Sequence, residues 1–147
     1  GGTERGLERA LMLFLDACAL IYRFEGGAPF RDACVRLLGE LAAQQPGSPV
    51  AVSRLSVLEC RVKPLREGDT ALLARYESFF SACHIVELSA AVVERATALR
   101  VRHGLKTPDA LQAASALALP APVCFVTGDA GFARIAELDV RLIVPSA

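Results

Sequence analysis

The sequence has 147 residues, of which 53% are hydrophobic, and its 16 basic residues balance its 16 acidic ones, as expected for one compact domain. Charges and prolines interrupt every apolar stretch before it reaches the roughly 20 residues of a membrane span, which speaks against a membrane protein. Five widely spaced cysteines without a C-x-x-C pair, and only two histidines, favour free thiols in a reducing cytoplasm over disulfides or a zinc site.

The first eleven residues, 1–11, are expected to be an N-terminal extension or a vector-derived segment. They begin with two glycines and lack the basic start and long apolar core of a secretory signal. Met12 would make a natural start, so a single domain is predicted over 12–147.

The first half of the chain alternates short apolar runs with helical patterns. Its predicted elements are strand 11–16, helix 30–45, strand 50–53, helix 54–62 and helix 70–82. In the first of these helices, apolar residues recur at helical spacing: Val35, Leu38, Leu41 and Ala42. Ser53 is a natural cap for the second helix, which is expected to end before Pro64.

The second half repeats this alternation. Its predicted elements are strand 84–88, helix 90–103, a helix within 105–117, strand 123–127, a short helix near 130–138 and strand 141–144. Ser89 is the expected cap and Gly104 the expected stop of the first helix. Thr107 is the expected cap of the next helix, and Pro108 its first residue. Five strands alternating with helices predict a three-layer α/β fold around a parallel sheet.

Four acidic residues stand at informative places on this frame: Asp16, Glu59, Asp109 and Asp129. Asp16 ends the first strand, Asp129 follows the fourth, and Asp109 opens the helix that leads into the fourth. Ligands of open α/β sheets bind beyond the carboxyl ends of the strands, beside helix N-termini, so these three acids are expected at one edge. Glu59 lies within the helix after the second strand, and its place is less constrained.

Each acid also has an ordinary structural explanation. Asp16 could cap the following helix, Asp129 could belong to a turn, and Asp109 could be a first-turn charge favoured by the helix dipole. Glu59 could pair with Lys63, four residues on. Together these explanations are weaker, because carboxylates gathered at one edge repel unless a cation or a proton offsets them. Oxygen ligands without histidine or thiolate point to Mg²⁺ or Mn²⁺.

Four segments resemble the acidic motifs of PIN-domain ribonucleases, in the same order and spacing: "LFLDACALIYRF", "SRLSVLECRV", "TPDALQAASAL" and "FVTGDAGFARI". The resemblance is strongest to the VapC-type toxins of bacterial toxin–antitoxin pairs, and it covers residues 12–145. It implies an α/β/α domain with a five-stranded parallel sheet in the order 3-2-1-4-5. Strands 1 and 4 would then be neighbours, which brings Asp16 close to Asp129.

The resemblance also implies an activity. Asp16, Glu59, Asp109 and Asp129 would be the catalytic carboxylates that hold Mg²⁺ or Mn²⁺ during endonucleolytic cleavage of RNA, and Thr127 would be a secondary polar contact. Such chains form homodimers and bind a small antitoxin protein whose tail enters the acidic site. The sequence departs from many relatives in having a cysteine two residues after Asp16 and a glycine two residues after Asp129.

Basic residues gather on either side of two of the acids. With the four acids set aside as ligands, the remaining charge is 16 − 12 = +4. The candidates for contact with RNA phosphates are Arg54, Arg61, Lys63, Arg100, Arg102 and Lys106. For any one of them, an ordinary solvated helix face remains an alternative.

Other function classes remain open at this stage. A phosphorelay receiver domain also places acids at strand ends, but it needs an acidic pair after the first strand and a lysine after the last, and both are missing here. A PIN-like module that binds RNA or protein without cutting is the more serious alternative. A third is a housekeeping RNA-processing nuclease without an antitoxin.

Overall fold

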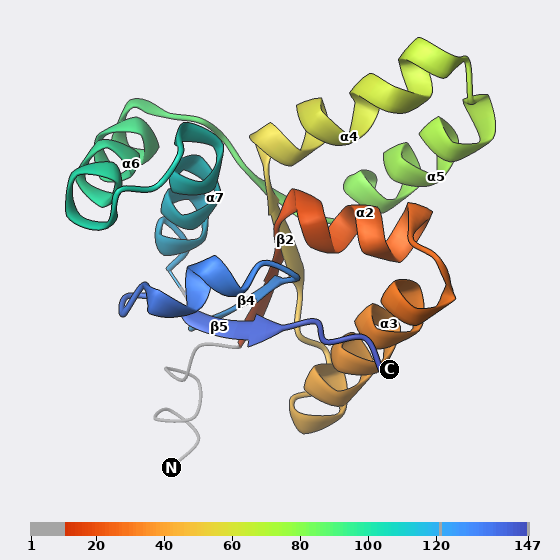
Figure 1. Cartoon of the computed structure of the whole chain (residues 1–147), viewed down its shortest axis with the longest axis horizontal. Helices are drawn as coiled ribbons and strands as arrows, with labels where there is room; N and C mark the ends of the chain where they lie inside the picture. Colours follow the sequence, from red (N-terminus) through yellow and green to blue (C-terminus); the bar gives the residue numbers. More distant parts are fainter. Residues whose placement is uncertain (1–10, 121, 147) are drawn as a thin grey trace.

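The computed structural model describes residues 11–120 and 122–146. In this part of the chain, five parallel strands form one sheet in the order β3-β2-β1-β4-β5, as predicted (Figure 1). The strands are β1 (Met12–Leu15), β2 (Val50–Ser53), β3 (His84–Val86), β4 (Val123–Thr127) and β5 (Asp139–Leu142). The helices are α2 (Ala17–Glu25), α3 (Ala28–Gln44), α4 (Arg54–Glu67), α5 (Thr70–Ser81), α6 (Ala90–His103), α7 (Thr107–Leu117) and the 3₁₀ helix η1 (Ala130–Arg134). Most of the expected N-terminal extension, 1–10, lies outside the described residues.

Two hydrophobic layers cover the two faces of the sheet. Successive side chains of a strand point to opposite faces, so Leu13 and Leu15 of β1 join one layer and Phe14 joins the other. The first layer contains residues from α2, α3, α4 and α5, and the second is built mainly by α6 and α7 (Figure 1). In the second layer, the rings of Phe14 and Phe125 stack with centroids 5.4 Å apart. The three-layer α/β/α prediction is therefore confirmed.

The register of β1 against β4 positions the acidic edge. Leu15 pairs with Val126, so Asp16 leaves β1 level with Thr127. The carboxyl ends of these two central strands therefore bring Asp16 and the loop that carries Asp129 to the same edge of the sheet.

Helix α4 differs from its prediction, which ended it before Pro64. The helix continues to Glu67 and ends at Gly68, whose φ of 66° is in the left-handed region. The Pro64 carbonyl accepts hydrogen bonds from the N–H groups of Gly68 and Asp69, which builds a last turn beyond the proline. Pro64 is itself buried, so tertiary packing offsets its missing N–H.

The two edge strands also differ from their predictions. Strand β3 ends at Val86 rather than at residue 88, because its partner β2 ends at Ser53, which pairs with Val86 and then caps α4. Strand β5 spans Asp139–Leu142 rather than 141–144, because its pairing with β4 begins at Asp139.

The buried face of α3 does not follow the apolar spacing in the sequence, and the predicted cap of α7, Thr107, was wrong. In α3 the buried residues are Ala33, Cys34 and Leu41, whereas Val35 is 48% exposed and Ala42 is also exposed. Helix α7 begins at Thr107 with Lys106 as its N-cap, because the Lys106 carbonyl accepts the Ala110 N–H at 2.9 Å. The predicted caps Ser53 and Ser89 and the predicted stop Gly104 are confirmed.

The cysteines agree with the prediction of free thiols. All five cysteines are free, and three of them are buried: Cys34, Cys60 and Cys124. Within residues 11–120 and 122–146, no helix is long and apolar enough to cross a membrane.

Candidate active site

Asp16 is the most deeply buried acid of the predicted site, with 3% of its surface exposed. It caps α2 by accepting the Ala19 N–H at 2.9 Å, and its other oxygen accepts the Thr127 hydroxyl at 2.5 Å. Burial raises its pKa from 3.8 to about 6; these hydrogen bonds oppose the rise, and the charges of Asp129 and Asp109 add to it. The capping explanation is therefore correct, but it accounts for only one of the two oxygens.

The loop after β4 places Asp129 beside Asp16. The backbone N–H of Asp129 donates to the Thr127 hydroxyl at 3.0 Å, and its side chain accepts the Gly131 N–H at 2.8 Å, which caps η1. The turn explanation for Asp129 is therefore also correct. Thr127, the predicted secondary polar contact, forms hydrogen bonds through its hydroxyl to Asp16 and to the Asp129 backbone.

Asp109 lies in the first turn of α7, where the N–H groups of the helix end favour a negative charge. Burial raises its pKa, the charge of Asp129 raises it further, and Lys106 opposes the rise. The helix dipole thus acts on Asp109 together with an acidic neighbour.

Glu59 projects from α4 and is exposed. Partial burial raises its pKa, the charge of Asp109 adds to this, and a hydrogen bond from Gln112 opposes it. The expected partner Lys63 pairs instead with Glu25, with Nζ 3.3 Å from Oε1. The simple ion-pair explanation of Glu59 is therefore wrong.

All four acids line a single cavity of about 350 Å³. Cys18, Tyr22 and Gln112 also line it, and an adjoining cavity of about 280 Å³ joins Asp109 and Asp129 to Lys106 and Arg134. Burial and then the charge of Asp16 raise the pKa of the Cys18 thiol, so this departure from the family pattern adds a neutral group beside the acids. The structure thus brings together the four residues that the sequence singled out.

The donor set fits a hard divalent cation in its chemistry. It consists of carboxylate oxygens that repel one another, and a bound cation would relieve that repulsion. Within residues 11–120 and 122–146, however, no three His, Cys, Asp or Glu side chains are gathered closely enough to hold an ion. Ligation would therefore require these side chains to turn toward one another across the cavity.

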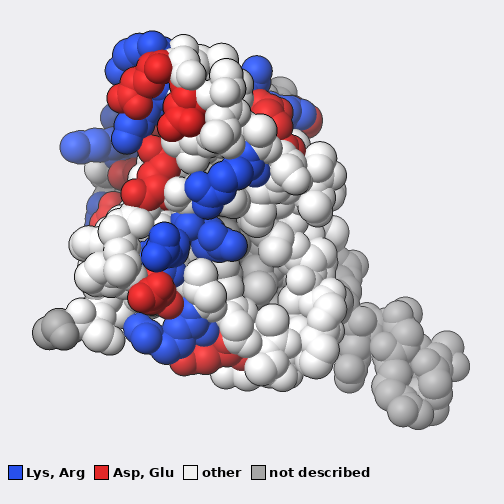
Figure 2. All heavy atoms as spheres, turned by 90° about the vertical axis from the view of Figure 1, so that its right-hand side faces the viewer, with Lys and Arg blue, Asp and Glu red and all other residues white. Residues whose placement is uncertain are grey.

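Most of the predicted RNA contacts are engaged within the chain. Arg54 makes two hydrogen bonds to Glu87, Arg61 pairs with Glu77, and Arg102 pairs with Glu137. Figure 2 shows one face of the molecule, on which blue basic and red acidic side chains are intermixed. On that face, the charges do not form one continuous basic surface.

Two basic side chains lie at the acidic site itself. Lys106, which was predicted, and Arg134, which was not, line the cavity that contains Asp109 and Asp129. Arg134 is fixed by a hydrogen bond of 2.6 Å to the His103 carbonyl. Arg100 donates to the Leu105 carbonyl at 2.9 Å and so braces the turn between α6 and α7.

Gln112 is the second residue that sequence reasoning missed. It lies in the alanine-rich helix α7, three residues after Asp109, with only 4% of its surface exposed. A polar residue at this spacing on a mostly apolar helix was a readable signal, because residues three apart lie on nearly the same helical face.

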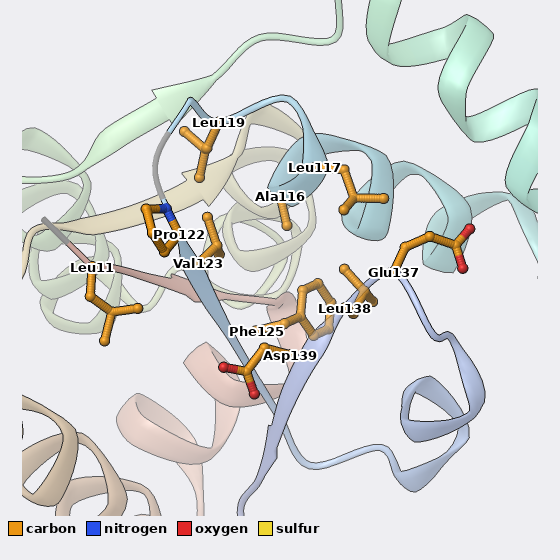
Figure 3. A pocket seen from close by; sticks show the side chains of 10 residues that line it. All are labelled: Leu11, Ala116, Leu117, Leu119, Pro122, Val123, Phe125, Glu137, Leu138 and Asp139. Carbon is orange, nitrogen blue, oxygen red and sulfur yellow. The ribbon is translucent and has the colours of Figure 1, made fainter. Parts of the chain in front are cut away.

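A separate cavity of about 330 Å³ opens near the amino end of β4 (Figure 3). Apolar side chains dominate its lining, among them Leu117, Val123 and Leu138, with two acids at its border: Glu137 and Asp139. None of the predicted site residues lines it. The acid-lined cavity at the carboxyl edge is therefore the candidate active site.

The order of the sheet and the acids at its carboxyl edge define a PIN-like α/β/α domain. A family model described as "PIN domain" matches residues 13–138, and the chain belongs to this family. No curated protein sequence matches it significantly.

Solved structures of similar fold cover nearly the whole chain. A toxin–antitoxin complex from Klebsiella pneumoniae is 26% identical, with a TM-score of 0.71 over 92% of this chain and 99% of that chain. VapBC2 from Rickettsia felis, bound to a DNA fragment from its promoter, is 21% identical, with a TM-score of 0.71 over 89% and 98% of the two chains. The sarcin–ricin loop cleaving toxin VapC20 from Mycobacterium tuberculosis is 18% identical, with a TM-score of 0.67 over 88% and 98%.

Proposed function

We propose that the protein is a Mg²⁺- or Mn²⁺-dependent endoribonuclease that acts as the toxin of a toxin–antitoxin pair. The observation that carries this proposal is the cavity lined by Asp16, Glu59, Asp109 and Asp129. Membership of the PIN domain family and likeness to the Klebsiella pneumoniae toxin–antitoxin complex support it.

Each carboxylate has a distinct task in this proposal. Asp16, fixed by Thr127 and by the α2 backbone, and Asp109, at the start of α7, are the principal ligands, with Asp129 beside them. A divalent cation bound there would supply a nucleophilic water at neutral pH and stabilise charge on the phosphoryl oxygens. Glu59 lies on the opposite helix, α4, and either completes the ligand set or orients the attacking water.

Lys106 and Arg134 would hold the RNA phosphate next to the carboxylates. Both line the cavity that contains Asp109 and Asp129, and a cation there attracts the phosphate backbone. The guanidinium of Arg134 is already oriented by the His103 carbonyl, which reduces the entropy lost on binding.

Two partner proteins are part of the proposal. A second copy of the chain and a small antitoxin are inferred from the family, and VapBC complexes are among the similar structures. The free thiols support the proposal that the protein functions in the reducing cytoplasm. Light scattering of the purified protein measures its oligomeric state, and co-expression with the product of the adjacent upstream reading frame tests the antitoxin.

The deciding experiment is RNA cleavage by the purified protein. We expect cleavage with Mg²⁺ or Mn²⁺, loss of cleavage with EDTA, and no effect of thiol alkylation that leaves the protein folded. Full activity in EDTA, or a stoichiometric requirement for zinc, would overturn the assignment. Tight RNA binding without cleavage would favour the binding module instead, and cleavage without any antitoxin would favour housekeeping RNA processing.

A further inference from the structure

Helices α4 and α7 face each other across a polar strip that leads into the acidic cavity. Each side contributes a residue at every third position: Ser53, Ser56 and Glu59 at and after the start of α4, and Asp109, Gln112 and Ser115 in α7. Three residues are close to one helical turn, so each set lies along one side of its helix.

Hydrogen bonds across the strip join the residues of α7 to those of α4 in antiparallel order. Ser115 Oγ donates to Ser53 Oγ at 2.9 Å, and Gln112 Nε2 donates to Ser56 Oγ at 2.9 Å. These four residues are all buried. The next pair in the same order is Glu59 and Asp109, whose carboxylates repel each other at the wall of the cavity.

The amide of Gln112 is bonded on one side only. Its nitrogen donates to Ser56, whereas its Oε1 is buried without a hydrogen-bond partner among the described residues. An unpaired buried acceptor destabilises a folded protein, and a methionine of similar length would avoid that cost. A buried polar atom without a partner is expected where a residue serves a functional site rather than stability.

Gln112 and Glu59 lie close enough to interact. The Gln112 side chain lowers the pKa of Glu59 and so favours its charged form, and both residues line the acidic cavity. Gln112 is anchored to Ser56, one helical turn before Glu59 on the same helix. It therefore offers Glu59 a fixed amide, about one helical turn along α7 from Asp109.

We propose that Gln112 is a positioning residue, whose anchored amide holds the Glu59 carboxylate in the acid-lined cavity. This inference rests on the proposed nuclease function. It assigns to Gln112 no contact with RNA, and its effect on catalysis passes through Glu59. The competing explanation is that the strip only fastens α4 to α7.

Single-turnover and steady-state RNA cleavage, with melting curves, separate the two explanations. Gln112→Met removes the unpaired acceptor but also the hydrogen bond to Ser56, and these two changes oppose each other, so we expect a melting temperature close to that of the wild type, an unchanged KM and a kcat lower by about 10- to 100-fold. Ser115→Ala is the matched control, because it breaks the other bonded pair of the strip, farther from the cavity. It should lower the melting temperature and leave kcat unchanged.

A double variant tests whether Gln112 acts through Glu59. Gln112→Met combined with Glu59→Gln should have the same kcat as Glu59→Gln alone, because the donor has no remaining task. Multiplied losses would mean that Gln112 acts independently, and they would overturn the inference. A wild-type kcat in Gln112→Met, or equal losses in Gln112→Met and Ser115→Ala, would also overturn it.

Crystal structures of the wild type and of Gln112→Met supply a readout that does not depend on activity, with Gln112→Leu as a second variant if the first does not fold. We expect Glu59 to turn away from the cavity in the variant, and an unmoved Glu59 would overturn the inference. If the wild type does not cleave RNA, the proposed function fails, and the position of Glu59 still decides the inference about Gln112.

Discussion

Thr127 Oγ1 donates to Asp16 Oδ2 at 2.5 Å, across the neighbouring ends of β4 and β1. The same hydroxyl accepts the Asp129 N–H at 3.0 Å, so one side chain links two acids of the site. Thr127→Val keeps the shape but leaves both partners unsatisfied, and we expect it to lower the free energy of unfolding by about 1–3 kcal/mol. Urea unfolding measures this, with Thr127→Ser as the control. Equal stability of the two variants would mean that the hydroxyl is dispensable.

Gly128 allows the ring of Tyr22 to lie against the loop that carries Asp129. A Cβ atom at this position would stand 2.3 Å from Tyr22 Cε2 and 3.1 Å from Cys18 Sγ. We expect Gly128→Ala to lower the free energy of unfolding by about 1–3 kcal/mol and to reduce cleavage, because the loop must shift. Tyr22→Ala in the same chain should recover part of both losses, and purely additive effects would refute the contact.

The frame of the site could be predicted because it depends on local signals. A run of apolar residues that ends in Asp16, and caps such as Ser53 and Ser89, fix strand ends and helix starts within the chain itself. Parallel topology then brings Asp16 and Asp129 to one edge. The limits of β3 and β5 could not be predicted from local signals, because they depend on how far the neighbouring strands extend.

The finer partners of the site depend on tertiary packing. The pairing of Lys63 with Glu25 rather than Glu59 joins α4 to α2, and no spacing along one helix could indicate it. Arg134 reaches the site only because η1 packs near the end of α6. Gln112 was different, because its spacing from Asp109 was visible, although its bond to Ser56 on another helix was not.

The buried charge of Asp16 makes the metal-free protein sensitive to pH. Its pKa is raised from 3.8 to about 6, so the folded protein binds this proton more tightly than the unfolded chain. The resulting stabilisation is fully present below pH 3.8 and is lost as the pH rises through about 6. Between these two pH values, the contribution of Asp16 to the free energy of unfolding falls by about 3 kcal/mol. Urea unfolding in EDTA should show this loss in the wild type, whereas Asp16→Asn, which can still cap α2, should not show it.

Lys106 and Arg134 should matter more for RNA than the basic residues that are paired within the chain. Replacing both by glutamine should weaken RNA binding and flatten its salt dependence, by about one unit of slope for each phosphate that is no longer neutralised. The matched control replaces Arg54 and Arg61, which pair with Glu87 and Glu77, and a smaller change is expected there. Binding is measured by fluorescence anisotropy at several salt concentrations. Equal effects of the two pairs would argue against a phosphate site beside Asp109.

Replacing Asp109 distinguishes two possible roles of this residue: a charge that interacts with the helix dipole, and a metal ligand. If it serves only the dipole of α7, Asp109→Asn should lower stability by about 0.3–1 kcal/mol, with or without metal. A ligand behaves differently, because without metal it is one of several repelling carboxylates. The metal-free variant should then be at least as stable as the wild type.

Magnesium separates the two roles of Asp109 further. Mg²⁺ that binds only the folded state raises the melting temperature of the wild type, and it should raise that of Asp109→Asn far less. RNA cleavage should fall sharply in the variant. Paired melting curves in EDTA and in millimolar Mg²⁺, with a cleavage assay, measure all three effects. If Asp109→Asn is destabilised equally in both conditions and still cuts RNA, then Asp109 is a first-turn charge, and the proposed metal site is wrong.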